Sequence, residues 1–111
     1  MKYFLSVLFL TLSFSAHSSA ITFDDSLKLT SFQKDALSGM FQVCLPDTDA
    51  EMLLTHKQGF GFQLQMSALH QGEILTGYGV NRFNVQDEGT IFIHSRFAVK
   101  EVCEKSNKLS D

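Results

Sequence analysis

The middle of the chain, from Phe60 to Ala68, reads FGFQLQMSA. Apolar side chains alternate there with glycine, glutamine and serine, and this period of two predicts a half-buried β-strand with one solvent-exposed face. His70-Gln71-Gly72-Glu73 follows and predicts a turn. The alternation resumes from Ile74 to Val80, so we expect a second strand that pairs antiparallel with the first.

Two glycines lie on one face of this second strand, at positions 77 and 79. Glycine inside a strand favours either a bulge or the close approach of another backbone. Residues 81–85 continue the strand or begin a short third one, and Asp87-Glu88-Gly89 predicts a turn.

The C-terminal part, from Thr90 to Val102, reads TIFIHSRFAVKEV. Mostly apolar residues occur at every second position of this segment, so we expect a last strand there. In that strand Phe97 faces the core, while Phe92 lies on the opposite face beside His94 and Arg96.

A helix is predicted before the strands, over residues 30–44. Thr30-Ser31-Phe32-Gln33 matches a capping box, in which Thr30 and Gln33 each satisfy a backbone N–H of the other. Apolar residues then recur at helical spacing, and Pro46 stops the helix. The predicted stripe consists of Phe32, Ala36, Leu37, Met40, Phe41 and Cys44.

Residues 47–59 fit two interpretations. Thr48-Asp49-Ala50-Glu51 repeats the capping-box pattern and Gly59 is a natural stop, which together predict a short helix over 48–57. The competing interpretation is a strand, Glu51–His56, followed by a hairpin turn at Lys57-Gln58-Gly59. The capping pattern favours the helix.

These elements predict an α+β fold, an antiparallel meander of three to five strands with one or two N-terminal helices packed on its apolar face. Residues 21–29 are expected to form a short edge strand or an ordered lead-in, and the polar residues 104–111 to fray. Cys44 and Cys103 are the two cysteines of the chain, and in an exported protein this even count predicts a disulfide. The bond would join the end of the helix to the final strand.

The first twenty residues predict export. Lys2 is followed by an apolar run from Phe4 to Phe14 and by small residues up to Ala20, which is the pattern of a secretory signal peptide cut after Ala20. The apolar run is shorter than the roughly twenty residues that span a bilayer. We therefore expect a single small domain, residues 21–111, in the periplasm, with release into the medium left open.

The composition argues against several function classes. The chain has nine basic and twelve acidic residues and a formal net charge of -3, without a basic cluster, so nucleic acid and anionic lipid are not expected as partners. His56, His70 and His94 lack the close spacing of metal ligands on one face, so no metal site is predicted. We find no motif for a cofactor or for nucleophilic catalysis, and do not expect an enzyme.

The remaining expectation is a protein that binds and neutralises another exported protein, as an inhibitor or as an immunity protein against a secreted toxin or hydrolase. An accessory factor of an envelope assembly, or a small ligand-binding module, is the alternative. The candidate contact residues lie on the acidic turn and on the wet faces of the predicted strands, where charged and aromatic side chains favour protein contacts. They are Gln86, Asp87, Glu88, Arg82, His94, Arg96 and Tyr78.

Overall fold

The computed structural model describes residues 21–59, 61–82 and 88–110. The predicted signal peptide, residues 1–20, lies outside these ranges, and so do Gln86 and Asp87 of the acidic turn. The elements, in chain order, are β1 (Ile21–Phe23), η1 (Asp25–Leu27), α2 (Ser31–Cys44), β2 (Ala50–Gln58), β3 (Gly61–His70), β4 (Glu73–Asn81) and α3 (Glu88–Ser110).

The strands form one sheet in the order β1-β2-β3-β4. The strands β2, β3 and β4 are antiparallel neighbours, of which the pairing of β3 with β4 was predicted, but β1 pairs with β2 in parallel. The α+β class is therefore confirmed, whereas the prediction of a purely antiparallel meander is wrong. Two parallel strands need a long connection, and α2 provides it between β1 and β2.

The hairpin between β3 and β4 confirms the predicted turn. His70 pairs with Glu73, and the two residues between them, Gln71 and Gly72, have φ angles of 52° and 81°. Positive φ at both positions is typical of the type I′ turn, whose twist matches that of the flanking strands.

Residues 50–58 form a strand, so the predicted helix over 48–57 is wrong and the competing strand is correct. Ala50 and Met52 are buried and lie opposite Ala68 and Met66 of β3. Pairing with β3 extends from Ala50 to Gln58, interrupted by one irregularity between Leu54 and His56, whereas an isolated helix of this length is marginal even with a good cap.

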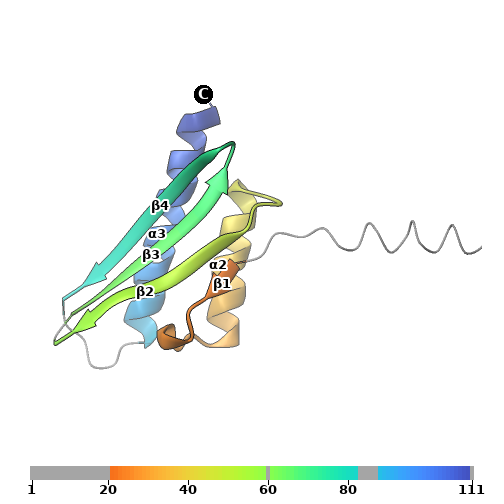
Figure 1. The fold of residues 1–111 in the computed structure, drawn as a ribbon. Coiled ribbons are helices and arrows are strands. Elements are labelled where there is room, and N and C mark those ends of the chain that lie inside the picture. Colours follow the sequence, from red (N-terminus) through yellow and green to blue (C-terminus); the bar gives the residue numbers. More distant parts are fainter. Residues whose placement is uncertain (1–20, 60, 83–87, 111) are drawn as a thin grey trace, which may run out of the picture.

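Both helices pack on the same face of the sheet, and among the described residues no helix covers the other face (Figure 1). The capping box of α2 is confirmed, because Thr30 Oγ1 accepts from the Gln33 N–H at 3.1 Å and Gln33 Oε1 accepts from the Thr30 N–H at 2.9 Å. The buried core lies between the two layers. Among its fully buried side chains are Leu37 and Phe41 of α2, Leu64 and Met66 of β3, and Val99 and Val102 of α3.

The C-terminal segment is a helix of 23 residues, so the prediction of a last strand over Thr90–Val102 is wrong. Helix α3 also includes residues 104–110, which were expected to fray, and it follows the meander, whereas the predicted helices were both N-terminal. The buried positions recur at helical spacing, with Ile91, Ser95, Ala98 and Val102 on the side facing the sheet.

The two glycines of β4 allow α3 to pack closely on the sheet. A Cβ atom at position 77 would lie 2.2 Å from the carbonyl oxygen of Ala98, and one at position 79 would lie 2.6 Å from that of His94. Of the two alternatives expected for Gly77 and Gly79, the close approach of another backbone is therefore confirmed. Helix α3 crosses β4 at a distance that a side chain at either position would prevent.

The disulfide between Cys44 and Cys103 is confirmed, with a Cα–Cα distance of 5.6 Å. It joins the last residue of α2 to the middle of α3, not to a final strand. Within the described ranges, no helix has both the length and the apolar character needed to cross a membrane.

Candidate functional site

An apolar groove of about 580 Å³ lies between α2 and α3. The two helices lie side by side and run in the same direction along the sheet (Figure 1). We call this feature the inter-helix groove, and it is defined by Met40, Val43 and Cys44 of α2 and by Ile93, Arg96, Phe97, Val99, Lys100 and Cys103 of α3.

Large apolar side chains of the groove are exposed to solvent. Val43 is 85% exposed, Phe97 is 56% exposed and Ile93 is 52% exposed. A contiguous exposed apolar surface on a small protein is typical of a contact site.

The disulfide forms part of the groove wall, because Cys44 and Cys103 both line it. This bond holds the two walls together, and both helices are also anchored in the core through Phe41 and Val99. The groove therefore exists before any partner binds, which lowers the entropic cost of binding.

The charged side chains that line the groove are both basic. The Arg96 guanidinium carbon lies 5.8 Å from the centre of the Phe92 ring, and Lys100 Nζ lies 3.9 Å from a carboxylate oxygen of Glu104. Lys100 and Glu104 are both exposed, and an ion pair of this kind contributes little to stability, so it does not hold Lys100 away from a partner. The groove thus has a positive rim on a chain whose formal net charge is -3.

Of the predicted contact residues, Arg96 alone lines the inter-helix groove. His94 lies two residues away on the same helix and therefore points to a different side, so the two are not neighbours on a strand face as expected. Its ring contacts Phe62 edge-on with centroids 5.8 Å apart, and lies 6.2 Å from the Phe97 ring.

The other predicted contact residues do not line the groove, although the depression that contains Tyr78 and His94 shares Phe97 and Lys100 with it. Tyr78 and His94 line a shallow depression of about 330 Å³ between β4 and α3. Arg82 follows the end of β4 and Glu88 begins α3, and both are exposed. Gln86 and Asp87 lie outside the described residues, so the acidic turn stays a prediction.

Sequence reasoning missed most of the groove. Reading the C-terminal segment as a strand assigned Phe97 to the core, although a helical period places Ile93, Phe97 and Lys100 on one exposed face. On α2, the predicted apolar stripe is not buried along its whole length, because Phe32 at its start is 79% exposed. The helical spacing of residues 93, 97 and 100 was the available signal.

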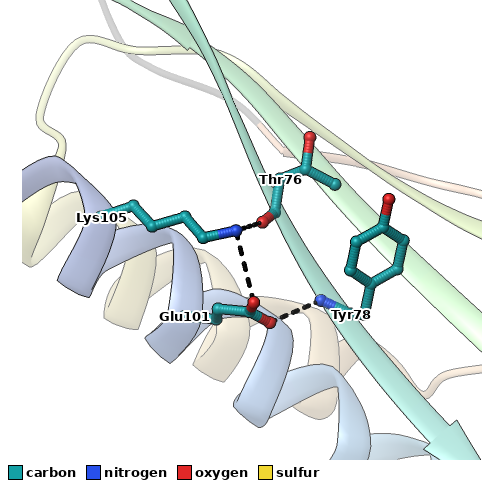
Figure 2. A network of polar contacts seen from close by, with 4 residues as sticks. All are labelled: Thr76, Tyr78, Glu101 and Lys105. Carbon is teal, nitrogen blue, oxygen red and sulfur yellow. Dashed lines mark hydrogen bonds and ion pairs between the residues drawn. The ribbon is translucent and has the colours of Figure 1, made fainter.

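Side chains of α3 also cover the outer edge of β4 (Figure 2). The Tyr78 N–H donates to Glu101 Oε2 at 2.8 Å, and Lys105 Nζ donates to the Thr76 carbonyl. Lys105 Nζ also lies 3.3 Å from Glu101 Oε1. We call Glu101 and Lys105 the β4 edge clip, because β4 is the last strand of the sheet and its outward N–H and C=O groups would otherwise be free to pair with another strand.

The Asp24 carboxylate also has a structural role. Hydrogen bonds from the Ser26 N–H at 3.0 Å and the Leu54 N–H at 3.4 Å favour the charged form and lower the pKa of Asp24 below its ordinary value. The side chain caps η1 and ties it to β2. Within the described part of the chain, no three His, Cys, Asp or Glu side chains are grouped so that they could hold a metal ion.

Comparisons with models of known protein families, with curated proteins and with solved structures each returned no match for this chain.

Proposed function

We propose that this chain is a small exported protein that binds another exported protein and neutralises it, as an inhibitor or an immunity protein does. The observation that carries the proposal is the inter-helix groove, with its exposed Val43, Ile93 and Phe97. The contact surface is centred there and includes Arg96, one of the residues expected from the sequence.

The shape of the groove favours a protein partner over a small molecule. A site for a small ligand encloses most of the ligand surface. Here Val43 is almost fully exposed and Phe97 is more than half exposed, so the walls are too open to surround a small molecule. A protein surface covers such a groove from above and buries the exposed side chains in a single step.

The framework also suits a tight complex. The disulfide between Cys44 and Cys103 joins the two walls, so little ordering is needed when the partner docks. Phe97, which lies near Ile93 and Arg96 in the groove, has the character of a binding hot spot, since large aromatic anchors surrounded by other contacts dominate interface energies.

The proposal is tested with two matched variants. Phe97→Ala removes an exposed aromatic ring inside the groove, and Phe32→Ala removes an exposed ring of α2 outside it. The full-length protein is expressed with a C-terminal affinity tag, partners are captured from envelope extract, and the captured protein is purified. We expect Phe97→Ala to weaken the measured affinity at least tenfold, while Phe32→Ala changes it by less than twofold.

Two further readouts separate the alternatives. The proposed role requires the purified partner to lose its own activity when the protein is added; retained activity would favour an accessory role in an envelope assembly. Equal affinities for the two variants would refute the groove as the contact surface. A form that lacks residues 1–20 should give no protection in cells, and full protection by that form would contradict the export step.

A further inference from the structure

We infer that the partner fills the inter-helix groove with an amphipathic α-helix that carries carboxylates along one side of its apolar stripe. This inference rests on the proposed function and names the element of the partner that the groove accepts. It follows from the nature of the walls, from the positions of the apolar side chains and from the charge of the rim.

The walls of the groove are helices, and this decides what kind of backbone fits. Apart from the last carbonyl groups of α2, the residues of α2 and α3 use their backbone N–H and C=O groups within the helix, so the walls offer few of these groups to a partner. An extended peptide pressed against Val43 and Phe97 would bury its own backbone groups without partners, which is costly. A helix satisfies its own backbone and presents only side chains.

Strand addition is disfavoured at the edge of the sheet nearest to α3. The β4 edge clip occupies the Tyr78 N–H and the Thr76 carbonyl, which lie on the outward side of the last strand (Figure 2). An incoming strand would have to displace both contacts before it formed its own. Strand addition at this edge therefore competes with existing contacts, whereas the inter-helix groove is open.

The apolar positions match the spacing of a third helix. Ile93 and Phe97 are four residues apart on α3, and Val43 of α2 lies farther along the groove, next to the disulfide between Cys44 and Cys103. Because the two walls run side by side in the same direction, a helix laid along the groove contacts both of them (Figure 1). Its apolar anchors then recur at i, i+3 or i+4, and i+7.

The positive rim of the groove favours a partner that is negatively charged there. Arg96 and Lys100 are four residues apart on α3, which corresponds to a rise of about 6 Å along the helix. Asp or Glu side chains one turn apart on the partner would face both of them, and the Arg96 guanidinium can bind a carboxylate through two hydrogen bonds. Among the described residues no Asp or Glu lines the groove itself, and Glu104, which lines the adjoining depression, makes only an exposed ion pair with Lys100.

The test is a selection followed by a charge reversal. Phage-displayed random 16-residue peptides are selected on the oxidised protein recovered from the periplasm, and peptides that also bind the uncharged variant Val43→Ser/Phe97→Ser are discarded. We expect the remaining peptides to have apolar residues at helical spacing, one or more pairs of Asp or Glu, and no internal proline. Proline-rich or alternating peptides, basic peptides, or the absence of any enrichment would overturn the inference.

The most enriched peptide is then synthesised and its affinity measured by fluorescence anisotropy. Arg96→Glu/Lys100→Glu should weaken binding at least tenfold, and the control Lys57→Glu/Lys108→Glu, which changes the net charge equally at exposed positions away from the groove, should leave it within twofold. An equal loss in the two double variants would contradict recognition by the rim.

The two proposals fail in different ways. If the selected peptides lack the helical and acidic pattern while Phe97→Ala still weakens capture of the natural partner, the helix inference is wrong and the proposed function stands. If Phe97→Ala leaves that capture unchanged, the proposed function is wrong as well.

Discussion

Replacing Gly77 with alanine adds a single methyl group and should destabilise the fold strongly. In an unobstructed strand the same change is mildly favourable, because glycine inside a strand costs about 0.5–1 kcal/mol relative to alanine. Here the new Cβ would lie 2.2 Å from the Ala98 carbonyl oxygen and 3.0 Å from its carbon. The close contact between β4 and α3 therefore reverses the expected sign.

The size of the destabilisation depends on which atoms must move to relieve the clash. The obstacle is the backbone of α3, which cannot turn aside as the tip of a flexible side chain does. Helix α3 must shift by roughly 1 Å or more against a core that contains Val99 and Val102, and overpacking of this kind costs about 1–3 kcal/mol or more. We expect about 3 kcal/mol, which lowers the melting temperature by roughly 12–24 °C in a domain of this size.

Gly39 provides the matched control. It lies in α2, is exposed, and has no atom within 4 Å of a Cβ built on it. Gly39→Ala should raise the free energy of unfolding by about 0.5–1 kcal/mol, because alanine is the better helix former.

The assay is urea unfolding of the oxidised protein, followed by circular dichroism and by a thermal melt. Gly77→Ala should fall well below the wild type and Gly39→Ala slightly above it. Adding Ala98→Gly to Gly77→Ala should not restore stability, since the clash is with the backbone of residue 98. A Gly77→Ala protein as stable as the wild type would refute the reasoning, and so would full rescue by Ala98→Gly.

Three other features give further predictions. Replacing Cys44 and Cys103 with serine should cost roughly 4 kcal/mol for a sequence separation of 59, and the unfolded, non-reduced wild type should titrate with no free thiol. Because the folded pKa of Asp24 is lowered, its contribution to stability is present above the ordinary pKa of 3.8 and is lost as the pH falls through the folded value; Asp24→Asn should therefore flatten the acid limb of a stability-against-pH curve. Alanine at both positions of the β4 edge clip should increase self-association in sedimentation velocity, whereas alanine at the exposed pair Lys100 and Glu104 should not.

The features that the sequence by itself determined depend on neighbours a few residues away. The capping box at Thr30 and Gln33 and the tight turn at Gln71-Gly72 are closed by local hydrogen bonds and backbone preferences. The alternation along β3 indicates one buried face and one more exposed face, whichever elements pack on the strand. With two cysteines in the chain, only one intramolecular pairing was possible.

The tertiary structure decided the elements whose local signals were divided. Residues 90–102 contain apolar side chains at period two and at helical spacing together, and nothing nearby separates the two readings. The helix prevails because its backbone at Ala98 and His94 packs closely on Gly77 and Gly79 of β4, a contact with residues 21 and 15 positions away in the chain. Residues 50–58 became a strand for a similar reason, since β3 supplied the paired backbone.

The inter-helix groove could not be predicted from the sequence, for the same physical reason. Whether Val43 and Phe97 are buried depends on what lies opposite them, and their own apolar character does not report it. The groove exists only because α2 and α3, more than forty residues apart in the chain, pack side by side on one face of the sheet and are joined there by a disulfide. Local patterns determined where the chain turns and where helix α2 begins, and long-range packing determined which apolar side chains stay exposed for a partner.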